Sequence, residues 1–182
     1  MDKLFEQKRH NYMEFGQIYF WTATINKWQK LLLEDQFKDI IVKSLEYLSC
    51  INKIDVFAFV IMPNHIHLIW RIKEPNGKET LQGSFLKYTA YEFKKILSAE
   101  TLSKYAINSI NKSFEFWQRD PMAIHLYTPN VMFQKLDYLH NNPTAKHWEL
   151  ANKPSNYQYS SAHFYEGNRT HYSFLKDLRL EI

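Results

Sequence analysis

The stretch Phe57-Ala-Phe-Val-Ile-Met-Pro-Asn-His-Ile-His-Leu-Ile-Trp70 consists of two apolar runs separated by Pro63-Asn64. Proline and asparagine favour tight turns. The stretch therefore predicts two strands, 56–62 and 65–72, that pair as a hairpin. The turn also fixes the residue at which the second strand begins.

The second predicted strand carries two histidines on one face. Side chains alternate along a strand, so His65 and His67 point the same way, and the residues between and after them point into the core. Those core residues are Ile66, Leu68 and Trp70. Buried imidazoles without partners cost free energy, and binding a divalent metal is one way to use such a pair. Half-exposed or hydrogen-bonded histidines fit the same pattern, so it leaves both interpretations open.

A short, well-bounded helix is predicted further along the chain. Thr128 and Pro129 are suited to the N-cap and the first helical position, and Pro143 ends the helix. Its apolar stripe consists of Met132, Leu136 and Leu139. Tyr138 and Asn142 are four residues apart and share a different face, where they present a phenol and an amide oxygen together. An exposed tyrosine beside a helix-capping asparagine is the alternative interpretation.

Four motifs follow one another along residues 10–166: Met62-Pro-Asn-His-Ile-His-Leu-Ile69, Phe116-Trp-Gln-Arg-Asp120, Tyr138-Leu-His-Asn-Asn-Pro143 and Tyr157-Gln-Tyr-Ser-Ser-Ala162. Their residues and order resemble the HUH single-tyrosine transposases, in the branch of REP-associated tyrosine transposases and their relatives. One departure is Thr144, where the family usually has valine, and this position lies outside the chemistry.

The resemblance implies a metal-dependent single-stranded DNA endonuclease and strand transferase. It makes His65 and His67 ligands of a divalent cation, Tyr138 the nucleophile that forms a covalent 5′-phosphotyrosine, and Asn142 the third metal ligand. Two neutral imidazoles and an amide oxygen leave coordination positions open for phosphate oxygens or water, which suits Mg²⁺ or Mn²⁺. The expected partner is single-stranded or hairpin DNA.

The remaining pattern completes a βαββαβ order. Residues 17–25 predict the first strand, residues 34–48 a helix, residues from Thr80 onward a second helix, and residues 114–118 a short fourth strand. This order predicts an α+β, ferredoxin-like sandwich, in which helices cover one face of an antiparallel sheet. The other face is expected to be open and to carry both the active site and the DNA.

An open sheet face offers aromatic rings for base stacking and cations for phosphates. The DNA-binding candidates are Trp117, Gln118 and Arg119 from the second motif, with Arg71, Lys87, Lys94 and Lys95. Each has an ordinary structural alternative, because a buried Trp117 is simply a core residue and lysines on a helix are usually just solvated. Tyr157, Tyr159, Ser160 and Ser161 are expected to dock the C-terminal segment, and His140 is left outside the site.

Composition bounds these interpretations. The 182 residues, 45% of them hydrophobic, suffice for a single domain spanning 1–182, with a core at about 10–166 and a tail at 167–182. The net charge of +4 modestly favours a polyanionic partner. Cys50 is the single cysteine, and no signal peptide or membrane-spanning run is evident, so we expect a cytoplasmic monomer or homodimer that does not engage a membrane.

Two other function classes stay open from the sequence. The chain could be a DNA-binding protein that keeps the fold without the chemistry, although the joint presence of His65, His67, Tyr138 and Asn142 argues against this. It could also be an RNA-binding protein that uses the open sheet for stacking, a role that needs none of these four residues.

Overall fold

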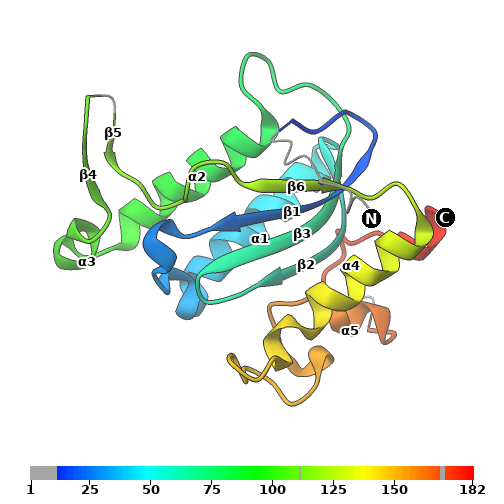
Figure 1. Ribbon diagram of the computed structural model, residues 1–182. Helices are drawn as coiled ribbons and strands as arrows, with labels where there is room; N and C mark the ends of the chain where they lie inside the picture. Colours follow the sequence, from blue (N-terminus) through cyan, green and yellow to red (C-terminus); the bar gives the residue numbers. More distant parts are fainter. Residues whose placement is uncertain (1–11, 111, 169–170) are drawn as a thin grey trace, which may run out of the picture.

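A four-stranded antiparallel sheet forms the centre of the protein (Figure 1). This computed structural model describes residues 12–110, 112–168 and 171–182. The strands are β1 (Ile18–Thr24), β2 (Ile54–Ile61), β3 (His65–Ile72) and β6 (Met122–His125), in the spatial order β2-β3-β1-β6. The hairpin predicted around Pro63-Asn64 is β2-β3, closed by the Met62 amide donating to the His65 carbonyl at 2.8 Å.

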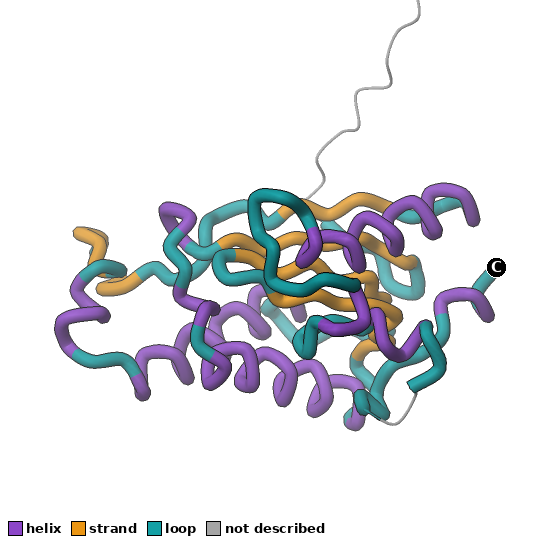
Figure 2. Tube along the Cα trace, turned by 90° about the horizontal axis from the view of Figure 1, so that it is seen from below, coloured by secondary structure: helices purple, strands orange, loops and turns teal. Residues whose placement is uncertain are grey.

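Two long helices cover one face of this sheet, as Figure 2 shows from below. They are α1 (Asp35–Cys50) and α2 (Leu81–Ile96), which begins at the predicted Thr80 cap, where the hydroxyl accepts from the Gly83 amide. Between helices and sheet lies the larger apolar core, which includes the β3 residues Ile66, Leu68 and Trp70. The predicted ferredoxin-like α+β class is therefore confirmed.

The second face of the sheet is not as open as the sequence suggested. Helix α4 (Pro129–Asn141) packs across β2 and β3 on this face, opposite α1 and α2 (Figures 1 and 2). Its apolar stripe joins a second core, in which Leu136 and Leu139 pack with sheet residues that include Phe20 and Val60. The face is covered because β2 carries apolar residues on both sides, and burying both sides stabilises the fold.

The fourth strand lies at a different position from the predicted one. Within residues 114–118, Phe114 pairs with Ala106 in a separate two-stranded hairpin, and Trp117 forms a single bridge to Ile25. The fourth strand of the main sheet is β6 at Met122–His125. Asp120 has a left-handed backbone, with φ of 59°, and Pro121 follows it without an amide hydrogen to donate. These two residues interrupt the pairing with β1, which resumes after them.

The C-terminal region attaches to the edge of β2. Ser160 bridges Val60, and the Tyr157 hydroxyl donates to the Ile61 carbonyl at 2.8 Å, so the fourth motif docks this segment as expected. Beyond residue 166 the chain still packs, since Leu178 is fully buried in the second core. None of the helices in the described part of the chain is long and apolar enough to cross a membrane.

The remaining short elements connect these layers. They are α3 (Ala99–Ser103), α5 (Ala162–Tyr165), the hairpin of β4 (Ala106–Ser109) and β5 (Lys112–Phe114), and the 3-10 turns η1 (Asn26–Trp28), η2 (Leu31–Leu33), η3 (Asn142–Thr144), η4 (Pro154–Asn156) and η5 (Leu178–Leu180).

Candidate active site

Strand β3 brings His65 and His67 together on the face that α4 covers. Their ring centroids lie 4.7 Å apart, and both side chains are buried. The antiparallel register sets Thr22 of β1 opposite His67. The prediction that the two histidines share one face and the alternate residues enter the larger core is confirmed.

Each histidine is held through its Nδ1 atom. His67 Nδ1 is 2.7 Å from the Thr22 hydroxyl, and His65 Nδ1 is 2.6 Å from Asn64 Oδ1. The amide nitrogen of Asn64 donates to the Trp28 carbonyl, so its oxygen faces His65 and accepts the Nδ1 hydrogen. His65 therefore carries its proton on Nδ1 and keeps a lone pair on Nε2, as a metal-binding imidazole requires.

Both imidazoles are neutral near pH 7. Burial lowers the pKa of His65 to about 4, and the nearby His147 acts in the same direction. Burial also lowers the pKa of His67 well below its ordinary range, and the neighbouring His65 and Lys135 contribute in the same direction. His67 Nε2 is buried and has no hydrogen-bond partner among the described residues. An unsatisfied buried nitrogen is costly, and a bound cation would remove that cost.

Helix α4 presents Tyr138 to the histidines. The rings of Tyr138 and His67 have centroids 5.5 Å apart, and Phe20 packs at the edge of the tyrosine ring. Tyr138 remains 53% exposed, so its hydroxyl is accessible to a substrate. The helix begins as predicted, with the Thr128 hydroxyl accepting from the Val131 amide and Pro129 in the first turn.

Asn142 follows the last residue of α4 and lines the same cavity as the histidines and Tyr138. Its backbone carbonyl accepts from the Ala145 amide, but its side-chain amide makes no hydrogen bond within the part of the chain that the structure describes. The side chain is thus available to a ligand rather than used to cap the helix.

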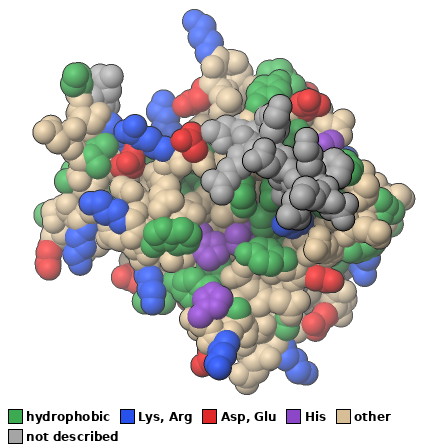
Figure 3. All heavy atoms as spheres, viewed as in Figure 1, with side chains coloured by type: hydrophobic (Ala, Val, Ile, Leu, Met, Phe, Trp, Pro, Cys, Tyr) green, Lys and Arg blue, Asp and Glu red, His purple; other side chains and the backbone are tan. Residues whose placement is uncertain are grey.

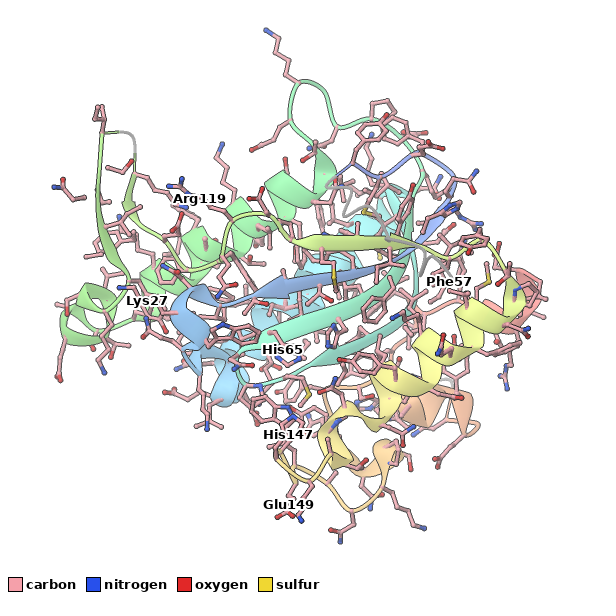
Figure 4. All side chains as sticks on the ribbon, in the orientation of Figure 1. Lys27, Phe57, His65, Arg119, His147 and Glu149 are labelled. Atoms are coloured by element: carbon pink, nitrogen blue, oxygen red, sulfur yellow. The ribbon has the colours of Figure 1, made fainter. Side chains whose placement is uncertain are left out.

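A cavity of about 760 Å³ contains all four predicted residues. It lies between the beginning of β3 and the C-terminal part of α4, and Figure 4 shows His65 on the sheet and His147 on the loop that follows the helix. Figure 3 shows histidine side chains reaching the surface on this face, with hydrophobic side chains beside them. The predicted open surface is therefore an apolar cavity with one wall formed by α4.

The donor set fits a hard divalent cation that keeps open coordination positions. Among residues 12–110, 112–168 and 171–182, no group of three or more His, Cys, Asp and Glu side chains could hold a metal. Further protein ligands would thus be neutral oxygens such as that of Asn142. Two imidazoles with an amide oxygen leave positions for phosphate oxygens or water, which suits Mg²⁺ or Mn²⁺ better than a closed zinc site.

The structure does not bring the seven predicted DNA-binding residues to this cavity. Trp117 is a core residue, since it is 6% exposed and its indole donates to the Thr89 hydroxyl. A buried ring cannot stack on a base, so Trp117 has the structural role of a core residue instead of the predicted DNA contact. Arg71 forms ion pairs with Asp55 at 2.6 Å and Glu181 at 2.7 Å, which tie the C-terminal segment to the sheet.

The other five lie on or beside the outer side of α2. Gln118, Arg119 and Lys87 line a second groove, where Arg119 pairs with Glu115. Lys94 lies over the Phe114 ring, and Lys95 pairs with Glu92. These positions are accessible, and a DNA contact there stays a prediction.

Several residues of the cavity were missed from the sequence. Asn64 was assigned only to a turn, although its place directly before His65 is a signal that could have identified it. Thr22 becomes a partner of His67 only once the strand register is known. Lys135 does not line the cavity, but its ammonium lies 5.7 Å from the Tyr138 ring centre, one turn earlier on α4. Trp28 and Trp148 lie on separate loops, and no sequence pattern indicates that they line this cavity.

The strand order and helix placement define a ferredoxin-like sandwich, and comparison with solved structures identifies a particular example. The chain has the fold of a REP-associated tyrosine transposase solved bound to a REP hairpin, with 19% sequence identity, coverage of 90% of this chain and 84% of that chain, and a TM-score of 0.60. A putative transposase from Deinococcus radiodurans is also similar, with 16% identity, coverage of 74% of this chain and 95% of that chain, and a TM-score of 0.44. No protein-family model and no curated protein matches the chain.

Proposed function

We propose that this protein is a metal-dependent endonuclease and strand transferase for single-stranded DNA, of the single-tyrosine transposase type. The observation that carries the proposal is the convergence of an exposed tyrosine and two neutral, oriented imidazoles in one cavity. The fold shared with a transposase that was solved bound to a REP hairpin supports DNA as the substrate, and hairpin-bearing single strands as the first to test.

The cavity residues would have two roles, metal binding and orientation of the metal-binding imidazoles. His65, His67 and Asn142 would hold Mg²⁺ or Mn²⁺ through two Nε2 atoms and an amide oxygen. When bound, such a cation acts as a Lewis acid toward oxygens of the scissile phosphate. Thr22 and Asn64 keep the imidazoles oriented through Nδ1, because a fixed ring does not have to reorganise during the reaction.

Tyr138 would supply the nucleophile. Its phenol oxygen attacks phosphorus, the bond from phosphorus to the 3′-oxygen breaks, the phenol proton passes to solvent, and the 3′-oxygen takes up a proton. The product is a 5′-phosphotyrosine and a free 3′-OH. Because the ester retains the energy of the broken bond, attack by a second 3′-OH releases Tyr138 and joins the strands without ATP. We assign no separate acid or base.

The experiment is a denaturing gel of end-labelled, hairpin-bearing single-stranded DNA incubated with protein and Mn²⁺. The expected result is a shifted band that protease removes, with no such band for Tyr138→Phe. That variant removes one exposed oxygen that makes no hydrogen bond in the described structure, so its fold and DNA binding should be unchanged. An adduct that persists in the variant would contradict the assignment of Tyr138. DNA binding without any adduct from wild type would favour a binding protein that lacks the chemistry.

A further inference from the structure

A strained turn presents Trp28 at the rim of the histidine cavity. Lys27 and Trp28 in η1 both have left-handed backbones, with φ of 55° and 57°, a conformation that residues with a Cβ rarely adopt. The turn is held by the Asn26 amide donating to the Phe116 carbonyl and the Trp28 amide donating to the Ile25 carbonyl. Yet the Trp28 side chain remains 61% exposed. Packing does not explain this strain, and strain of this kind is typical of ligand-binding positions.

A second indole, from a segment far along the chain, lines the same cavity. Trp148 lies on the loop after α4, where its ring centroid is 6.0 Å from that of His65. The ammonium of Lys30, two residues after Trp28, lies 6.0 Å from the Trp148 ring centre. The Trp28 turn and the Trp148 loop therefore meet at the rim of the cavity, with a positive charge between them.

One side chain links this rim to the histidines. Asn64 donates to the Trp28 carbonyl at 3.4 Å and accepts from His65 Nδ1 at 2.6 Å. The position of the Trp28 turn is thus fixed relative to His65. The two indoles therefore lie beside the place where the proposed function puts a phosphate.

We infer that Trp28 and Trp148 form a stacking subsite for an unpaired nucleobase adjacent to the scissile phosphate. This inference rests on the proposed function, which supplies the position of that phosphate. Indole rings stack on the flat faces of bases with little dependence on sequence, and the charge of Lys30 complements the DNA backbone. Bases within a duplex are already stacked on their neighbours, so the subsite would select single-stranded nucleotides.

The test measures binding without cleavage, in the Tyr138→Phe background. A hairpin with a single-stranded flank carries 2-aminopurine at each flank position in turn, and the fluorescence change on binding reports stacking. At one position or two adjacent positions we expect strong quenching. The Trp28→Ala variant should lose this quenching and bind roughly tenfold more weakly. Trp28→Phe should retain most of both, because a phenyl ring also stacks.

The matched control is Tyr47→Ala, which removes a 62% exposed aromatic ring from α1, on the far side of the sheet. It should change neither affinity nor fluorescence. An abasic nucleotide at the quenched position should weaken DNA binding by the protein in which Trp28 is intact. The same nucleotide should have little further effect on the DNA affinity of Trp28→Ala. Because Trp148 is half-buried, Trp148→Phe is the conservative variant for that residue, and it should weaken quenching at the same position.

The outcomes separate this inference from the proposed chemistry. Unchanged affinity and unchanged quenching in Trp28→Ala would overturn the subsite, whether or not wild type forms an adduct. Equal effects of the abasic nucleotide on wild type and on Trp28→Ala would also overturn it. If wild type forms no adduct but Trp28-dependent quenching persists, the chemistry is contradicted and the subsite is supported.

Discussion

The Tyr138 ring and the His67 ring of the same chain lie 5.5 Å apart, at an interplanar angle of 63°. Helix α4 reaches this position by packing on its own sheet through Leu136 and Leu139. The proposed nucleophile and the proposed metal ligands therefore belong to one polypeptide, and the proposed site would be formed within a single chain. This arrangement has a direct consequence for mixtures of inactive variants.

Mixing Tyr138→Phe protein with a His65→Ala, His67→Ala double variant should restore no activity. Complementation needs a tyrosine from one chain to reach the histidines of another, and the packing of α4 provides no such route. The measurement is the covalent adduct gel at equal concentrations of the two variants. Recovery of a substantial share of the wild-type adduct would mean that α4 exchanges between chains.

The histidine pair should be required for metal binding. The double variant His65→Ala, His67→Ala should lose detectable Mn²⁺ binding by calorimetry and should form no adduct, while its circular dichroism spectrum stays that of the wild type. His125→Ala serves as the control, because that histidine is exposed and lies outside the cavity. Mn²⁺ affinity that matches the control in the double variant would remove these residues from the ligand set.

Loss of the Asn142 amide should weaken metal binding without unfolding the protein. We expect Asn142→Ala to raise the dissociation constant for Mn²⁺ by roughly tenfold or more. Asn142→Asp should recover affinity, since it keeps an oxygen in place and adds a charge. Asn141→Ala is a matched control, because Asn141 lines the same cavity but its amide donates to the Asp137 carbonyl. Equal effects of the two alanine substitutions would favour the helix-end interpretation.

The elements of the fold that local signals determine were predictable from the sequence. Pro63-Asn64 marks the hairpin, and Thr128 with Pro129 marks the start of α4, because caps and turns depend on a few neighbouring residues. The fourth strand was misplaced because Phe116 and Trp117 are buried in the larger core, but only Trp117 forms a bridge beside β1, to Ile25. The break in pairing at Asp120 and Pro121 decides which segment pairs with β1. This break depends on the three-dimensional arrangement of the chain and not on a local sequence signal.

The same division applies to the site. Four residues of the first and third motifs, His65, His67, Tyr138 and Asn142, do meet in one cavity. Their supporting residues come from other elements: Thr22 is set by strand register, and Trp28 by a turn whose left-handed backbone has no sequence signature. The extent to which α4 covers the sheet was not predicted, although the continuous apolar run of β2 is a signal that could have indicated it.

Lys135 should accelerate the chemical step. The Lys135 residue is half-buried, and its ammonium lies 5.7 Å from the Tyr138 ring centre and 5.2 Å from that of Phe20. The ammonium can therefore stabilise negative charge on the attacking oxygen or the phosphate. We expect Lys135→Met to slow single-turnover cleavage by roughly tenfold at saturating Mn²⁺, and Lys135→Arg to restore most of the rate. Equal rates for Lys135→Met and wild type would limit Lys135 to packing.

His140 should make the protein sensitive to acid. Its Nε2 lies 2.8 Å from the Ser161 hydroxyl, in a contact that joins α4 to the segment docked on β2. Burial lowers the pKa of His140 to about 4, and His163 contributes in the same direction. In the unfolded chain the pKa of histidine returns to about 6.5. The folded state therefore favours the neutral ring, and this contribution to stability is fully present above pH 6.5 or so.

Between about pH 6.5 and pH 4 the unfolded state binds a proton that the folded state excludes. The free energy of unfolding should therefore fall as the pH falls, by at most about 1.4 kcal/mol per pH unit for His140 alone. His65 and His67 act in the same direction, because burial lowers the pKa of each. His140→Gln keeps an amide for Ser161 but cannot be protonated, so its stability should decline less steeply than that of wild type. Urea unfolding at pH 7, 6 and 5 in the presence of EDTA measures the difference. The exposed control His125→Gln should show the same change of unfolding free energy with pH as wild type. If the unfolding free energy of His140→Gln changes with pH in parallel with that of wild type, the His140 ring is not a source of the acid sensitivity.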